Sequence, residues 1–161
     1  MKFKGIILAG GKGTRLNPLT KSVNKHLLPI YNKPLIFYPL SILMLANIKE
    51  ILIIVNEEDY DSYKKLLGNG SRMGIKITYK IQEKPNGIPE AFTIGKDFIQ
   101  NSNVALILGD NFFYSQGLTE TLIQSQKNFN GAKIFCYKVK NPNEFGIAEI
   151  KNKKIISLKE K

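Results

Sequence analysis

Apolar residues along the chain alternate between short continuous runs and segments with the spacing of a helix. The short runs, which are typical of buried strands, occupy residues 3–8, 50–55, 75–81, 104–108 and 132–139. Helical patterns with matching start and stop residues occupy 34–48, 57–67, 89–99 and 118–129. Residues 146–150 and 154–158 have the pattern of a small hairpin. This order predicts an α/β fold: a doubly wound, mainly parallel, Rossmann-like sheet with helices on both faces.

Polar or glycine-rich segments follow three of these predicted strands. They are residues 9–16, the stretch from Gln82 to Gly87, and the pair Gly109 and Asp110. In doubly wound sheets, ligands bind at the carboxyl ends of the strands. We therefore expect the three segments to surround one crevice.

The segment after the first strand has the composition of a triphosphate-binding loop. It contains three glycines, two basic residues and one hydroxyl: Gly10, Gly11, Gly13, Lys12, Arg15 and Thr14. Glycines let backbone N–H groups converge on an anion without a Cβ in the way. A Walker loop is excluded because Lys12 is followed by glycine, and a dinucleotide fingerprint is excluded because Leu16 stands at its third glycine.

Acidic residues are absent from the first 49 positions, so that net positive charge is concentrated in this part of the chain. The 161 residues have a net charge of +11, yet the first acidic residue is Glu50. Unopposed charge around residues 9–16, the glycine loop, favours a polyanionic ligand. A general bias of the sequence towards lysine is the alternative explanation of this charge. Nucleic acid is disfavoured as the partner because only two of the 24 basic residues are arginines, the residue that dominates bidentate phosphate and base recognition.

The bulk composition fits one globular domain over residues 1–161, with 43% hydrophobic residues. The single cysteine, Cys136, is expected to be a reduced, packed thiol on the predicted strand 132–139, as in a cytoplasmic protein. No apolar run is long enough to span a membrane, and the first residues lack the pattern of a signal peptide. The sequence thus predicts neither a membrane partner nor export.

Four polar residues near the strand ends are candidates for chemistry. Asp110 ends an apolar run and could cap a turn or bind Mg²⁺, which takes one or two carboxylates plus phosphate oxygens. Lys25 could extend along apolar surface or reach phosphates. His26, the only histidine, suits binding or packing better than catalysis, and Gln82 could sit in a turn or read a base edge with its amide.

Four motifs together resemble one known family. They are the stretches 8–16 (LAGGKGTRL), 25–30 (KHLLPI), 33–40 (KPLIFYPL) and 108–111 (LGDN). The chain is similar over its whole length to the sugar nucleotidyltransferases, in particular to the glucose-1-phosphate thymidylyltransferases. The resemblance implies attack of a sugar 1-phosphate on the α-phosphate of dTTP or UTP, release of pyrophosphate, and a place in nucleotide-sugar and polysaccharide biosynthesis.

The resemblance also implies roles for individual residues. The nucleotide would contact Leu8, Gly10, Gly11, Gly13, Thr14, Arg15, Lys25, His26, Gln82, Pro85 and Gly87. Catalysis would depend on Arg15 and Lys25 at the phosphates and on Asp110 as the Mg²⁺ ligand. The sugar phosphate would contact Gly146, Glu160 and Lys161.

Three departures from the family pattern bear on these expectations. His26 stands where glutamine is frequent, and Phe145 stands where tyrosine is usual. The sequence ends at Lys161, where the family continues for nearly as many residues again, including a second metal-binding aspartate. It is therefore expected to be a fragment, a truncated product or one part of a split protein that binds nucleotide but forms little product. The alternative is a catalytically incompetent nucleotide-binding fragment or partner subunit, and a homo-oligomer is possible.

Overall fold

The structure is a computed structural model that describes residues 2–11, 13–84, 86–127, 129–142, 145–152 and 154–159. The chain divides into two compact units, Met1–Gln124 and Ser125–Lys161.

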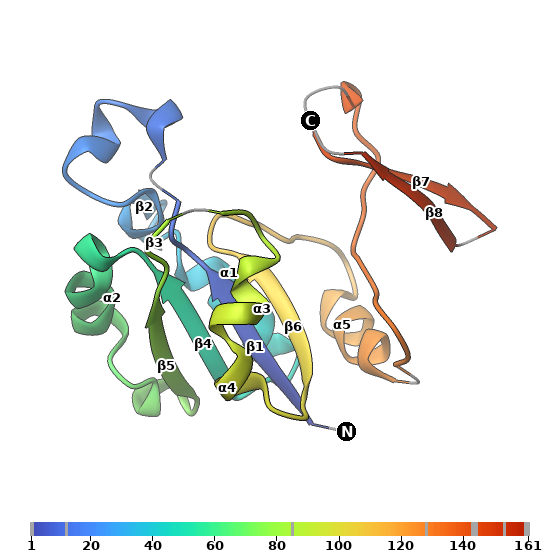
Figure 1. Ribbon diagram of the computed structural model, residues 1–161, viewed down its shortest axis with the longest axis horizontal. Helices are drawn as coiled ribbons and strands as arrows, with labels where there is room; N and C mark the ends of the chain where they lie inside the picture. The colour runs from blue at the N-terminus through green and yellow to red at the C-terminus, as the bar shows by residue number, and fades with distance from the viewer. Residues whose placement is uncertain are drawn as a thin grey trace. The chain divides into compact units, whose positions relative to one another are not determined.

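The first unit is built on a four-stranded parallel sheet (Figure 1). Its strands, in spatial order, are β5 (Lys76–Ile81), β4 (Glu50–Val55), β1 (Phe3–Leu8) and β6 (Asn103–Leu108). β1 lies at the centre, with Gly5 opposite Ile51 of β4 and Ala105 of β6. The first four predicted strands are thus confirmed, in the order of a doubly wound fold.

The helices lie where the sequence predicts them, with shorter bounds. They are α1 (Phe37–Leu45), α2 (Tyr60–Leu67), α3 (Glu90–Ile94), α4 (Lys96–Ile99) and α5 (Leu118–Gln126). The helix expected over 89–99 is divided at Gly95. A Cβ at Gly95 would lie 2.9 Å from the Ala91 carbonyl oxygen and 3.1 Å from Ile6 Cδ1, so glycine permits the close approach to the sheet. None of the helices in the described ranges is long and apolar enough to cross a membrane.

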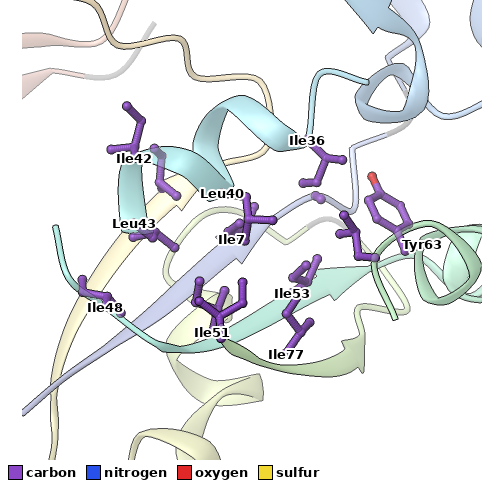
Figure 2. Packing of buried hydrophobic residues seen from close by; sticks show 14 of the residues in the cluster. Ile7, Ile36, Leu40, Ile42, Leu43, Ile48, Ile51, Ile53, Tyr63 and Ile77 are labelled. Carbon is purple, nitrogen blue, oxygen red and sulfur yellow. The ribbon is translucent and has the colours of Figure 1, made fainter. Parts of the chain in front are cut away.

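The two faces of the sheet pack against different helices, because successive strand residues point to opposite faces. Odd-numbered residues such as Ile7, Ile51 and Ile53 join side chains of α1, α2 and α5 in one buried cluster (Figure 2). Even-numbered residues such as Ile6 and Leu52 join side chains of α3 and α4 in a second cluster. Helices therefore cover both faces, as predicted.

A short antiparallel pair precedes α1 and was not predicted. It joins β2 (Pro29–Ile30) to β3 (Lys33–Pro34) through Tyr31, whose φ is +61°. Two residues per strand are too few to produce a readable alternation of apolar and polar positions.

The second unit contains the predicted hairpin but not the predicted fifth strand. The hairpin joins β7 (Ile147–Lys151) to β8 (Lys154–Lys159). Residues 132–139 alternate as a strand would, yet their backbone has no β pairing among the described residues, and an extended segment needs a neighbouring strand to form a ladder. Cys136 is accordingly exposed rather than packed, which corrects the expectation from its sequence context.

The central position of Ile53 makes the stability of the first unit testable. Ile53 is fully buried, so Ile53→Ala should lower the free energy of unfolding by about 2–5 kcal/mol through lost burial and a residual cavity. Ile81, at the end of β5, is 39% exposed, and Ile81→Ala should cost clearly less. Urea unfolding of both variants measures the difference; equal losses would contradict this assignment of the core.

Candidate functional site

The carboxyl ends of β1, β5 and β6 surround a pocket of about 240 Å³. Its lining combines glycine, apolar and charged residues: Leu8, Gly11, Lys25, His26, Gln82, Gly87, Ile88, Leu108 and Asp110. The three polar segments that the sequence places after strands therefore do meet. Seven of the nine lining residues are among those singled out from the sequence, and Ile88 and Leu108 are additions.

The glycine loop requires glycine at two positions for different reasons. A Cβ at Gly10 would lie 2.6 Å from Gln82 Oε1, so the strand end and the Gln82 amide can touch only because Gly10 has no side chain. Gly13 has a φ of +62° and leads into a 3₁₀ turn, η1 (Thr14–Leu16). This turn leaves Thr14 and Arg15 exposed, outside the pocket lining.

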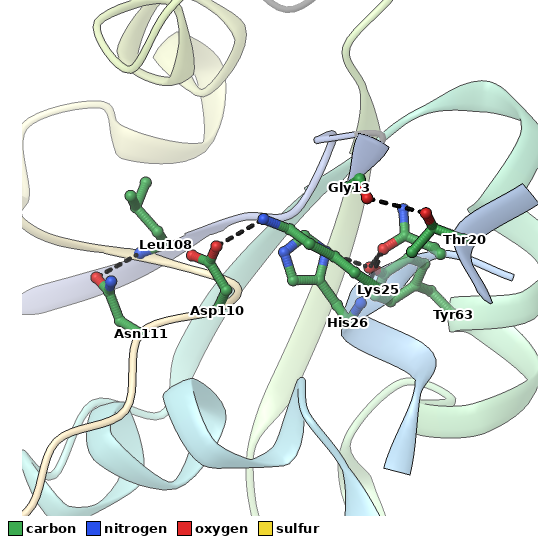
Figure 3. A network of polar contacts seen from close by, with 9 residues as sticks. Gly13, Thr20, Lys25, His26, Tyr63, Leu108, Asp110 and Asn111 are labelled. Carbon is green, nitrogen blue, oxygen red and sulfur yellow. Dashed lines mark hydrogen bonds and ion pairs between the residues drawn. The ribbon is translucent and has the colours of Figure 1, made fainter. Parts of the chain in front are cut away.

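Lys25 and Asp110 form an ion pair within the pocket lining (Figure 3), with Nζ and Oδ2 separated by 2.6 Å. Lys25 begins the 3₁₀ turn η3 (Lys25–Leu27), and Asp110 follows β6. Partial burial opposes ionisation of Asp110, but the hydrogen bond and the charge of Lys25 outweigh it and hold the pKa of this carboxyl below its usual value. The pocket thus contains a matched positive and negative group.

A buried polar network holds the turn that carries Lys25. Asn24 Oδ1 accepts hydrogen bonds from the His26 backbone N–H at 3.0 Å and from the Tyr63 hydroxyl at 3.2 Å. Asn24 Nδ2 donates to Asp59 Oδ2 at 2.7 Å, and His26 Nδ1 lies 3.1 Å from the Tyr63 hydroxyl. The network ties the backbone on both sides of Lys25 to the start of α2, which restricts where its ammonium group can point.

His26 is neutral at physiological pH because of where it is packed. It is 2% exposed, and a Cβ at Gly109 would lie 2.8 Å from its ring. Burial lowers the pKa of His26 to about 4; the Lys25 charge acts in the same direction, and Asp110 and the Ala9 carbonyl oppose it. The histidine is therefore a packed, uncharged wall of the pocket, in agreement with a binding or packing role.

Gln82 is held in one orientation by a neighbouring carboxylate. It is 5% exposed and directly follows β5. Its Nε2 donates to Glu90 Oε2 at 2.5 Å, and Asn86 donates to the same carboxylate from Nδ2 at 2.9 Å and from its backbone N–H at 3.3 Å. These bonds from Gln82 and Asn86 lower the pKa of Glu90, which keeps it ionised and purely an acceptor.

The positive charge of the first 49 residues is not all available to a ligand. Lys2 and Lys4 both pair with Glu50 at the amino end of the sheet, away from the pocket. Lys33 stacks over the Tyr38 ring, with Nζ 4.6 Å from the centroid. The expectation of unopposed charge is therefore wrong for Lys2 and Lys4, and also for Lys25, which pairs with Asp110.

Some predicted site residues are not placed by this geometry. Gly146 lies in the second unit, just before β7. Lys12, Pro85, Glu160 and Lys161 lie outside the described residues. The supporting residues Asn24, Tyr63 and Glu90 were not singled out from the sequence. Nothing in a single sequence signals a contact between positions 39 residues apart, as in the bond from Tyr63 to Asn24. Glu90 is closer to its partner Gln82, but the loop between β5 and α3 must turn back to bring the two side chains together.

Comparison with known proteins decides the family. A family model described as nucleotidyl transferase matches residues 4–161. The chain belongs to this family. A glucose-1-phosphate thymidylyltransferase of Neisseria meningitidis is 55% identical over 99% of the chain, and one of Xanthomonas campestris is 48% identical over 98%. These alignments cover 56% and 54% of the relatives, so the chain spans about half the length of the curated nucleotidyl transferases that it matches.

Solved structures agree with the nucleotidyl transferase assignment. A Bacillus anthracis protein described as a glucose-1-phosphate thymidylyltransferase superposes with a TM-score of 0.89 at 39% identity, covering 98% of this chain and 64% of the other. A UDP-glucose pyrophosphorylase solved with UDP-glucose has a TM-score of 0.63 at 29% identity, covering 79% and 54%. The incomplete Rossmann-like fold is thus that of a nucleotidyl transferase.

Burial of His26 predicts a particular loss of stability in acid. Since the folded-state pKa of about 4 lies below the ordinary 6.5, the unfolded chain binds the proton first, and stability falls as the pH drops from 6.5 towards 4. This residue should account for about 2–3 kcal/mol of loss between pH 7 and 4.5. His26→Gln should remove that part, which urea unfolding of both chains at the two pH values measures. Identical pH dependence would show that the folded chain does not exclude the proton.

Proposed function

We propose that this chain is the nucleotide-binding domain, residues 1–161, of an enzyme that transfers a nucleotidyl group from dTTP or UTP to a sugar 1-phosphate. Glucose 1-phosphate is the preferred acceptor, and the products are a nucleoside-diphosphate sugar and pyrophosphate. The observation that carries the proposal is the shared pocket in which Gly11, Gln82 and Asp110, from three strand ends, meet Lys25 from the η3 turn. The names of the thymidylyltransferase relatives support the choice of base and sugar.

In this proposal the base lies against Leu8 and the loop after β5. Gln82 offers an amide donor and acceptor to the base edge, and the backbone at Gly87, whose φ is +99°, can approach closely. Pro85 belongs to the same loop. A pyrimidine ring suits this small pocket better than a purine does.

The phosphates would lie along the glycine loop. Backbone N–H groups at Gly10, Gly11 and Gly13 and the Thr14 hydroxyl would bind oxygens, while Arg15 and Lys25 would neutralise charge and His26 would close one wall. The sugar-phosphate oxygen attacks the α-phosphorus as pyrophosphate leaves. Such transfers depend on positioning and charge stabilisation, so the protein need not supply a nucleophile.

Asp110 is the residue that would hold Mg²⁺. The described residues contain no group of three or more histidine, cysteine or acidic side chains that could hold a metal, so a closed protein site is not available in that part of the chain. Mg²⁺ characteristically combines one or two carboxylates with phosphate oxygens and water, and a lone pocket carboxylate fits this preference. The ion would neutralise phosphate charge, and Lys25 would exchange Asp110 for a phosphate oxygen.

Gly146, Glu160 and Lys161 are proposed to contact the sugar phosphate. Exposed apolar residues such as Phe135, Ile156 and Leu158 support association with further protein, including a second copy. A cytoplasmic location is proposed from the chemistry of the substrates.

A nucleotide-binding fragment or partner subunit without catalysis is the second candidate, favoured by the fact that Asp110 is the one acidic residue in the described pocket lining. Pyrophosphate release from dTTP with Mg²⁺ and glucose 1-phosphate separates the two functions. Release that depends on the sugar phosphate supports transfer, whereas dTTP binding without release supports the binding module. Failure to bind any nucleoside triphosphate overturns both.

Arg15 should be needed for tight triphosphate binding. Arg15→Ala removes a charge-assisted phosphate contact and should weaken dTTP binding by about 1.5–3 kcal/mol, or roughly 10- to 150-fold. Arg72→Ala is the matched control, because Arg72 lies in η5 (Ser71–Met73), which precedes β5, at the opposite end of that strand from Gln82. Calorimetric titration with dTTP and Mg²⁺ compares them. Equal affinities in the two variants would remove the glycine loop from the triphosphate site.

Asp110 should couple nucleotide binding to Mg²⁺. In the wild type, Mg²⁺ should tighten dTTP binding by about tenfold or more, since it links a carboxylate to phosphate oxygens. Asp110→Asn should abolish that gain while leaving binding in EDTA undiminished, because Lys25 loses its competing partner. Asp61→Asn, on exposed α2 surface, serves as control. A full Mg²⁺ gain in Asp110→Asn would place the metal elsewhere.

A further inference from the structure

We propose that Glu90 is a positioning residue that fixes the order of oxygen and nitrogen in the Gln82 amide and thereby makes the pocket select thymine or uracil over cytosine. This inference rests on the proposed function, in which Gln82 faces the base. Glu90 itself does not line the pocket, so its effect on a ligand is exerted through Gln82 and the loop beside it.

Glu90 sets the direction in which the Gln82 amide points. A glutamine amide can rotate by half a turn with little change in shape, which exchanges its donor and acceptor sides. An ionised carboxylate only accepts hydrogen bonds, so Glu90 can bind the nitrogen side alone, at 2.5 Å. The oxygen side then faces Gly10, where a Cβ would lie 2.6 Å from Oε1.

The pyrimidine bases differ in the hydrogen-bonding groups on the edge that would face Gln82. Uracil and thymine present N3–H as a donor and O4 as an acceptor, whereas cytosine presents N3 as an acceptor and N4–H as a donor. In the proposed binding mode the ribose and phosphates follow the glycine loop, N3 of the base lies beside the oxygen of Gln82, and position 4 lies beside its remaining N–H. The locked amide therefore matches uracil and thymine, and it opposes cytosine at both atoms.

Glu90 also contacts the loop that carries Gly87 and Ile88. Glu90 accepts two hydrogen bonds from Asn86, one from the side chain and one from the backbone, so it holds this loop as well as the amide. One carboxylate thus fixes two neighbouring parts of the pocket lining relative to each other. Charge-assisted hydrogen bonds are the stronger kind, which suits this positioning role.

Glu90→Gln is the variant that tests the lock. It keeps the size of the side chain but adds a donor, so that both orientations of the Gln82 amide can be satisfied. Glu83→Gln is the matched control, because Glu83 is an exposed acid next to Gln82 and undergoes the same chemical change. Circular dichroism and a dispersed amide spectrum confirm that each variant is folded.

Two measurements on the 161-residue chain give the outcome. In ¹⁵N-labelled ligand-free protein, the Gln82 side-chain amide should shift in Glu90→Gln and stay unchanged in Glu83→Gln. In titrations with dTTP and dCTP at fixed Mg²⁺, wild type and Glu83→Gln should prefer dTTP strongly. The dTTP-to-dCTP preference should fall about tenfold in Glu90→Gln, mainly through tighter dCTP binding.

The amide shift and the titrations together separate failure of the role of Glu90 from failure of the nucleotide site. An unshifted Gln82 amide in Glu90→Gln shows that Glu90 does not hold it, and this overturns the inference whatever the nucleotide data. A shifted amide with an unchanged dTTP-to-dCTP ratio overturns the link to base choice but leaves the nucleotide site standing. A shifted amide in a chain that binds neither nucleotide overturns the proposed function together with the inference.

Discussion

The parallel pairing of β1 with β4 on one side and β6 on the other is the constraint on which the candidate site depends. It places the carboxyl ends of β1 and β6 in register, with Leu8 opposite Leu108, so that the residues following each strand emerge side by side. β5 joins the same edge through β4. Because both faces of this sheet are covered by helices, the strand ends are the places where backbone groups remain available to a ligand.

The pocket residues are held by a second layer of polar contacts that connects them to the helices. Asn24 and Tyr63 fix the turn that carries Lys25, and Glu90 fixes Gln82. No buried side-chain nitrogen or oxygen in the described residues lacks a hydrogen-bond partner. Satisfied buried networks of this kind restrict side-chain orientation, which matters most where function depends on placing charges rather than on a reactive group.

Much of the first unit could be predicted from the sequence, because strong local patterns coincide there with tertiary packing. Runs such as Ile51 to Val55 are buried on both faces and read as strands, and the polar residues that follow them mark the pocket. The prediction of a strand at 132–139 was wrong. Alternation of apolar and polar residues shows only that a segment is compatible with a strand, whereas a strand also needs a neighbouring strand to pair with. The contacts of Asn24 with Tyr63 and of Glu90 with Gln82 were not predictable either, since they depend on how the chain packs.

The ion pair between Lys25 and Asp110 has a consequence for the energetics of occupancy. Each partner satisfies the other while the pocket is empty, so neither an isolated anion nor an isolated cation can enter without leaving one charge uncompensated. An anion that binds Lys25 frees Asp110 and so raises its affinity for a cation. A cation that binds Asp110 raises the affinity of Lys25 for an anion by the same free energy, since coupling between two sites is reciprocal. The pair of Lys25 and Asp110 thus favours binding of a polyanion together with its counter-ion over binding of either alone.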